Sequence, residues 1–284
     1  MAKRKHLPAC SCTIKQLPQK QLMTAAKFAC SVNPANAVMM PDDAAAIAVL
    51  TQKYWGPSGV HLTVGFLSPA SAALQEKIVA HMNAWSKWCN ATFAIVQGAA
   101  KNADVRISLG AGGYWSYLGT DVANIPSTQP TMNLQGFSLQ TPESEYARVI
   151  RHETGHTLGC PHEHMRSVII NRLDYAKTVA YMQQTQGWSE QTTRNQVFTP
   201  ISEASVMATP TADEDSIMTY WFPASCTKNG APIVGGKDIT TRDGTFMGTV
   251  YPLSVTPPPV PPASGKFRVT LEVDAATKSI TVVP

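Results

Sequence analysis

Several short stretches between Val60 and Leu134 alternate apolar and polar residues, which is the pattern of strands with one buried face. In the first stretch, Leu62, Val64 and Phe66 would share that face. Glycine and proline residues separate the later stretches, as expected for turns. The predicted strands cover residues 62–66, 93–95, 105–109, 115–118 and 131–134.

Two segments show helical periodicity instead. Leu74, Ile78, Met82 and Trp85 recur at spacings of four, four and three, which predicts an amphipathic helix ending near residue 88. Ser68-Pro69 provides an N-cap and a first-turn proline for this helix. A second helix is predicted to open at Thr141-Pro142 and to carry residues 146, 149 and 150 into the core. Strands first and helices later, with a long irregular stretch after residue 165, indicate a mixed α/β or α+β domain.

Changes in composition divide the chain into three parts. Residues 1–44 have no clear period and are interpreted as a leader or pro-segment, and residues 45–252 form the main domain. Residues 253–284 combine a proline-rich linker with a predicted hairpin around Asp274–Lys278. Because an isolated hairpin is barely stable in water, this one is expected to dock on the main domain.

Composition narrows the function classes. Hydrophobic residues make up 44% of the 284 residues and charged residues 15%, which argues against disorder. The net charge is only +4 with no basic run, so a nucleic-acid partner is not expected. No apolar run approaches the ~18 residues of a membrane span. A monomer is expected.

The six cysteines and the N-terminal residues give information on metal binding and on the cellular compartment of the protein. The cysteines are scattered without a CxxC pair, so a four-thiolate zinc site is not predicted. The chain starts Met-Ala-Lys-Arg-Lys, but no apolar segment of a signal peptide follows. We therefore expect a cytoplasmic protein or export by a non-Sec route, or secretion if the true N-terminus is missing; the compartment stays open.

Candidate chemistry concentrates in residues 152–164, which contain four of the seven histidines. His152 and His156 are one helical turn apart, so both imidazoles can bind one metal ion. Gly159 can end the helix with a positive φ, which lets the chain return with His162 as a third ligand. Three imidazoles leave a position open for water, the arrangement of catalytic zinc, and Glu153 can take a proton from that water. One catalytic Zn²⁺ is predicted.

The motif HExxHxxGxxH resembles that of the metzincin metallopeptidases, and Glu163 followed by Arg166 resembles the astacin branch. Residues 216–220, Ser-Ile-Met-Thr-Tyr, are similar to the astacin-type Met-turn. By this resemblance Met218 forms an apolar floor under the metal. Tyr220 binds the metal or stabilises the reaction intermediate.

The resemblance implies a zinc endopeptidase that acts on protein or peptide substrates, with microbial astacin-like enzymes as the nearer likeness. It implies an α+β fold of two subdomains, with a twisted mixed sheet, two long helices, the Met-turn and a C-terminal helix over residues 237–252. Of the two astacin disulfides, only Cys89 stands at a matching position. Two alternatives stay open: a catalytically silent zinc module that binds peptides, and a structural or adhesive protein that works through its linker and hairpin.

Three expectations concern neighbours of the motif. His164 is expected to face solvent. Cys160 is expected to be a buried thiol or to form a disulfide, with Cys226 as a candidate partner.

The resemblance implies that Glu163 receives the freed N-terminus of a mature enzyme, so the chain is expected to be latent until it is cut between Cys30 and Tyr54. The candidate residues for blocking the metal are Asp42, Asp43, Cys10, Cys12 and Cys30. An equally favoured alternative is that residues 1–44 merely pack on the surface of the main domain.

Overall fold

A computed structural model describes residues 12–36, 53–201, 211–253, 270–274 and 279–283. Residues 1–253 form one compact unit and residues 254–284 a second. In the second unit β7 (Thr270–Asp274) pairs antiparallel with β8 (Ser279–Val283), which confirms the hairpin. Its docking on the first unit stays a prediction.

One mixed sheet of six strands organises the first unit, in the order β1-β5-β6-β4-β2-β3. Only β5 and β6 run antiparallel; the other neighbours are parallel. The strands from β2 onwards confirm the five predicted from alternation, with small shifts at their ends. The bounds are β1 Thr13–Lys15, β2 Val60–Phe66, β3 Ala91–Ile95, β4 Val105–Ser108, β5 Tyr114–Tyr117 and β6 Met132–Leu134.

The first predicted helix forms, but it begins later than expected. Its cap is Ser71, whose hydroxyl accepts from the backbone N–H of Leu74, and not Ser68. Ser68 instead accepts a hydrogen bond from the N–H of Leu109, which ties it to the end of β4. The described α-helices are α1 Gln19–Val32, α3 Ala72–Met82, α4 Glu143–Glu145, α5 Arg151–Thr157, α6 Ser167–Ile170, α7 Tyr175–Gln186, α8 Glu190–Thr193 and α9 Thr241–Val250.

Several 3-10 and π segments connect these elements. The π-turn η5 joins α4 to α5, so residues 143–157 form one run of helix that begins close to the predicted position. The 3-10 segments are η1 Pro34–Asn36, η2 Asn83–Lys87, η3 Ala100–Asn102, η4 Gly119–Asn124, η6 Glu163–Met165 and η9 Ala224–Cys226, and the π segments are η5 Tyr146–Ile150 and η7 Arg194–Phe198.

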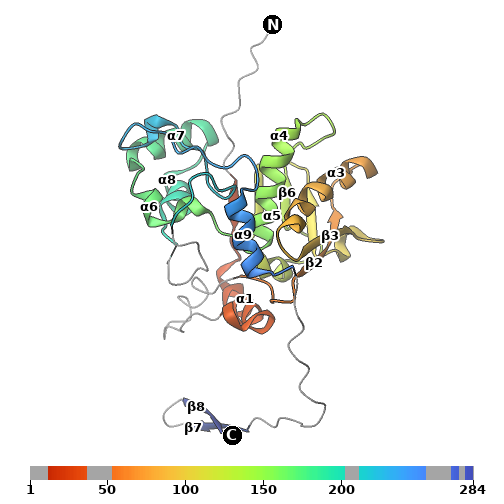
Figure 1. Cartoon of the computed structure of the whole chain (residues 1–284). Coiled ribbons are helices and arrows are strands. Elements are labelled where there is room, and N and C mark those ends of the chain that lie inside the picture. The colour runs from red at the N-terminus through yellow and green to blue at the C-terminus, as the bar shows by residue number, and fades with distance from the viewer. Residues whose placement is uncertain (1–11, 37–52, 202–210, 254–269, 275–278, 284) are drawn as a thin grey trace. The chain divides into compact units, whose positions relative to one another are not determined.

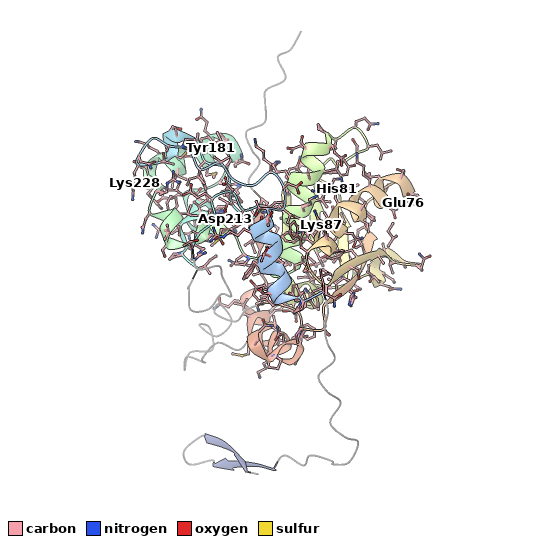
Figure 2. All side chains as sticks on the ribbon, viewed as in Figure 1. Glu76, His81, Lys87, Tyr181, Asp213 and Lys228 are labelled. Atoms are coloured by element: carbon pink, nitrogen blue, oxygen red, sulfur yellow. The ribbon has the colours of Figure 1, made fainter. Side chains whose placement is uncertain are left out.

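Two large apolar clusters and a third, small one beside helix α1 stabilise the first unit. The larger lies between the sheet and the helices α3 and α5, and Trp85 at its centre donates its indole N–H to the carbonyl of Arg151. The smaller of the two large clusters contains Cys12 and buried residues between positions 169 and 233, among them Phe222. In Figure 1, α6, α7 and α8 lie apart from α3, β2 and β3, with α5 and α9 between the two groups. The labelled side chains in Figure 2 repeat this division, with Glu76, His81 and Lys87 on one side and Tyr181 and Lys228 on the other. The α+β fold with a mixed sheet is therefore confirmed.

The segment before residue 37 has regular structure that its sequence did not predict. The strand β1 pairs parallel with β5 at one edge of the sheet. Helix α1 then packs against η4, with Leu17 and Ala25 buried around Ile125. At its end, the buried amide of Asn36 donates to the carbonyl of Tyr54, and its oxygen accepts from the N–H of Tyr54. Residues 12–36, called the leader below, are thus attached to the rest of the unit at both ends.

Candidate metal centre

Helix α5 carries the first two histidines of the motif. His152, Glu153 and His156 are all buried on it. The helix ends at Gly159, whose φ is +100° and where an added Cβ would lie 2.9 Å from Tyr54 Cδ1, so only glycine fits. The turn brings the buried His162 back to within 3.0 Å of His156, measured between the two Nε2 atoms. The local spacing predicted from the sequence therefore produces this three-histidine group.

Backbone carbonyls orient two of the rings. His152 donates its Nδ1–H to the carbonyl of Ile217 at 2.5 Å, and His156 donates to the carbonyl of Cys160 at 2.7 Å. Each Nε2 then keeps a free lone pair for a metal ion. Burial lowers the pKa of His152 to about 4 and the pKa of His156 and His162 well below the usual value. All three imidazoles are neutral near pH 7, which is the form that binds metal.

A fourth ligand-type atom completes the group. The sulfur of Cys12 lies 2.9, 3.3 and 3.0 Å from the Nε2 atoms of His152, His156 and His162. The four ligand atoms lie within 4.8 Å of one another, and all four residues are buried. Ligands of one tetrahedral zinc ion lie roughly 3.3–3.6 Å apart, so these separations are of the right order for zinc. Soft thiolate and imidazole donors also suit zinc, and the residues present fit that ion.

The structure distinguishes among the residues considered as blocking ligands. Cys12 joins the histidines, whereas Cys30 lies half-buried on α1 outside the cluster. Cys10, Asp42 and Asp43 lie outside the described residues. Nothing in the sequence indicates which of the three N-terminal cysteines would reach the metal ligands. In the structure, the pairing of β1 with β5 places Cys12, one residue before β1, at the histidines.

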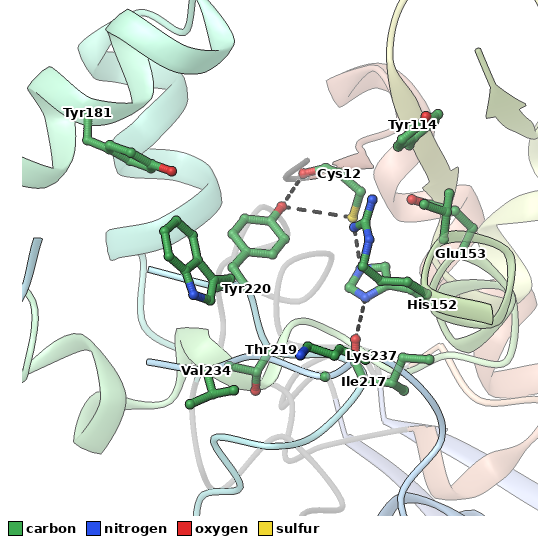
Figure 3. A pocket seen from close by; sticks show the side chains of 14 residues that line it. Cys12, Tyr114, His152, Glu153, Tyr181, Ile217, Thr219, Tyr220, Val234 and Lys237 are labelled. Carbon is green, nitrogen blue, oxygen red and sulfur yellow. Dashed lines mark hydrogen bonds between the residues drawn. The ribbon is translucent and has the colours of Figure 1, made fainter. Parts of the chain in front are cut away.

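Glu153 lies beside the metal ligands with both carboxylate oxygens shielded from solvent. Burial raises its pKa well above the usual range, and the neighbouring thiol of Cys12 acts more weakly in the opposite direction. Figure 3 shows Glu153, His152 and Tyr220 around one pocket, a cavity of about 500 Å³. A carboxyl group with a raised pKa in a cavity is suited to accept and return a proton.

Met218 and Tyr220, the two functional residues of the predicted Met-turn, lie beside the histidines. An added Cβ on Gly155 would be 2.5 Å from the sulfur of Met218, so this thioether packs directly against α5 between the two helical histidines. The ring of Tyr220 lies 4.4 Å from that of His162 between centroids. Its hydroxyl donates to the backbone carbonyl of Cys12 and lies 3.9 Å from the sulfur of that residue. With residues 12–36 in place, the hydroxyl of Tyr220 is therefore hydrogen-bonded to the leader.

The expectation that His164 faces solvent is wrong. Its ring is fully buried and stacks on Tyr220, with centroids 3.9 Å apart. Its Nε2–H donates to the carbonyl of Gln196 at 3.0 Å, and burial lowers its pKa to about 3. The ring also contacts Phe222 of the smaller apolar cluster. These partners come from residues 32 to 58 positions away, so local spacing could not reveal them.

Glu163 and Cys160, two further neighbours of the motif, have defined partners in the structure. Glu163 accepts hydrogen bonds from the guanidinium of Arg166 and from the N–H of Asp213, both at 3.0 Å. Burial raises the pKa of Glu163. The thiol of Cys160 is free and buried and lies 3.2 Å from the sulfur of Met247, and Cys226 is free as well. Of the two possibilities for Cys160, the structure therefore has the buried thiol and not the disulfide.

Among the residues that the structure describes, no helix is both long enough and apolar enough to span a bilayer.

Comparison with known proteins identifies the fold. No family model and no curated protein matches the chain. Among solved structures, one of myroilysin is 30% identical with a TM-score of 0.66, and the match covers 72% of this chain and 97% of that one. A second myroilysin structure is 31% identical with a TM-score of 0.54, over 70% of this chain and 86% of that one.

A hatching enzyme zinc-protease from Oryzias latipes (Medaka fish), high choriolytic enzyme 1, also matches at 19% identity and a TM-score of 0.47, over 76% of this chain and 98% of that one. The two myroilysin matches carry the assignment because their identities are 30% and 31% and their TM-scores are 0.66 and 0.54. The protein belongs to the astacin-like metzincins and is a zinc metalloendopeptidase of the astacin type.

Proposed function

We propose that the chain is a latent zinc endopeptidase in which His152, His156 and His162 hold one catalytic zinc ion and Cys12 fills its fourth position. The observation that carries this proposal is the buried group of three neutral imidazoles and one thiol, with Glu153 beside it. A zinc ion there would polarise the scissile carbonyl and lower the pKa of a bound water.

Glu153 is proposed as the general base. Its carboxylate takes the proton of the attacking water and passes it to the leaving amine. Because the side chain is buried, its raised pKa brings it closer to the range in which both the acceptance and the return of a proton are efficient.

Tyr220 is proposed to stabilise the reaction intermediate. Its hydroxyl is held by the carbonyl of Cys12 in the latent chain, and it becomes available when the leader leaves. A hydroxyl donor in a largely buried site stabilises negative charge on the substrate oxygen more strongly than water does. Met218 and Gly159 position the histidines without touching the substrate.

The leader is proposed to block the enzyme in two ways. The thiolate of Cys12 occupies the metal position that water needs, and β1 covers the edge of β5 along which an extended peptide would pair. Activation then requires a cut between Cys30 and Tyr54 and removal of the leader. In the mature form Glu163 is proposed to receive the new N-terminus.

Protein cleavage before and after processing tests this proposal. The full chain, loaded with zinc, is incubated with casein before and after limited proteolysis in the 37–52 segment, with and without a chelator. We expect cleavage only after processing, abolished by the chelator and restored by zinc. Cleavage by neither form would contradict the proposed function and favour a silent peptide-binding module. Equal cleavage by both forms would contradict latency alone.

A further inference from the structure

The leader strand β1 is hydrogen-bonded along both of its edges. One edge pairs with β5 over Thr13–Lys15. On the other edge, the side-chain amide of Gln196 accepts from the N–H of Ile14 at 3.1 Å and donates to its carbonyl at 3.3 Å. The middle residue of the strand is therefore held at both of its backbone groups by one side chain.

The alternation of a strand explains this contact. The N–H and C=O of one residue point to the same edge, and those of the next residue point to the opposite edge. Thr13 and Lys15 can pair with β5, so the backbone groups of Ile14 face the other way, toward Gln196. Any extended peptide in the same place would present the same pair of groups to Gln196.

A glutamine amide is well suited to bind the N–H and C=O groups of one residue in an extended strand. It carries one acceptor and one donor side by side, and rotation by half a turn exchanges them. It can therefore bind a strand that runs in either direction along β5, and it makes no demand on the side chain of the bound residue. A parallel leader and an antiparallel peptide would be bound equally well.

The position of Gln196 is fixed by the fold. It lies in the π segment η7, beside the fully buried Val197. Its backbone carbonyl accepts from the buried His164, the ring that stacks on Tyr220. Because this second contact uses the backbone, a change of the Gln196 side chain leaves it in place.

We propose that Gln196 is a substrate-binding residue that hydrogen-bonds the main chain of the bound peptide, at the residue that takes the place of Ile14. This inference rests on the proposed endopeptidase function. Ile14 is two residues from Cys12, which lies at the metal ligands, so the subsite is roughly 7 Å along the strand from that centre. It contributes to the affinity for extended peptides without selecting their side chains.

Gln196→Met tests the inference, because methionine keeps the size of the side chain and removes both hydrogen-bonding groups. The matched control is Gln191→Met, which changes an exposed glutamine of the neighbouring α8 whose side-chain amide donates to Asn195. After processing, Gln196→Met is expected to raise KM about 10-fold with kcat changed less than about 2-fold, since two neutral hydrogen bonds are lost. The control should keep both constants.

A second measurement on the unprocessed full chain does not depend on activity. The amide of Ile14 donates to Gln196, so its hydrogen exchange, followed by NMR, should accelerate at least ~10-fold in Gln196→Met and stay unchanged in Gln191→Met. Gln196→Glu, which keeps an acceptor but loses the donor, should raise KM at least as much as the methionine.

Each outcome has a distinct meaning. If the processed wild-type chain cleaves no protein, the proposed function is wrong and this inference fails with it. If the wild type cleaves and Gln196→Met has the same KM, or loses kcat and keeps KM, only the present inference is overturned. Unchanged exchange of the Ile14 amide would also overturn it.

Discussion

The histidine segment, residues 152–164, and the leader, residues 12–36, meet at one group of four ligand atoms but are built differently. The histidine segment supplies three ligand-type imidazoles from within eleven consecutive residues, and a helix followed by a glycine turn is enough to bring them together. The leader supplies one thiol, 140 residues before His152, and needs a strand pairing, a helix and two asparagine contacts to hold it there.

The histidine segment is therefore a fixed part of the domain, whereas the leader is attached through contacts that can be released. The histidines are fixed by carbonyls of their own domain, at Ile217 and Cys160. The leader is fixed by hydrogen bonds to β5, Gln196 and Tyr54, which a peptide could replace or a cut could release. We infer that the first region performs the chemistry and the second controls access to it.

Glu153→Gln should abolish catalysis and leave the metal site intact. The amide cannot accept a proton, so we expect peptidase activity of the processed chain to fall at least ~10³-fold with the zinc content unchanged. Elemental analysis of the dialysed protein checks the metal. His156→Ala is the matched change and should lose the metal itself. Near-normal turnover in Glu153→Gln would contradict the proposed base.

Tyr220→Phe should lower kcat of the processed chain by ~10–10³-fold with little change in KM. The ring keeps its stacking on His164, and only the hydroxyl that donates to the intermediate is lost. Steady-state kinetics on a fluorogenic peptide separate the two constants. A rise in KM alone would make Tyr220 a substrate-binding residue.

Cys12→Ser should weaken the block in the unprocessed chain. A serine hydroxyl is a far poorer zinc ligand than a thiolate, so we expect the basal activity of the full chain to rise about 10-fold or more. The increase stays below that of full processing because β1 still covers β5. Cys30→Ser, outside the cluster, is the control and should stay latent. Equal activity of the two variants would exclude Cys12 as the blocking ligand.

Asn36→Ala should loosen the far end of the leader. The variant leaves the buried N–H and C=O of Tyr54 without their partner, which costs about 1–3 kcal/mol. We expect faster proteolysis of the leader and a lower Tm for the full chain, and no change in kcat once the leader is removed. Ser31→Ala, at an exposed site of α1, should leave both unchanged.

The sequence predicted the parts of this structure that depend on local patterns. Alternation located strands β2 to β4, short stretches bounded by glycine and proline located β5 and β6, and the spacing of the histidines and Gly159 predicted the three-histidine group. It misplaced the start of α3, because Ser68 and Ser71 are both competent caps and only the contact of Ser68 with Leu109 decides between them. The leader gave no periodic signal, since β1 has three residues and α1 buries mainly alanines.

The remaining errors and gaps arise from long-range contacts. The burial of His164 could not be predicted from the sequence, because its partners Gln196, Tyr220 and Phe222 are distant along the chain. The choice of Cys12 over Cys30 likewise depends on the register of β1 against β5. Gln196 carries no motif, and only the strand beside it shows what it can bind.

The zinc K-edge X-ray absorption spectrum of the unprocessed full chain tests the central claim most directly. The account predicts one sulfur ligand at about 2.3 Å together with three imidazole nitrogens, and loss of the sulfur both in Cys12→Ser and after removal of the leader. A spectrum of the full chain with nitrogen and oxygen ligands alone would contradict the claim that the Cys12 thiolate keeps this enzyme latent.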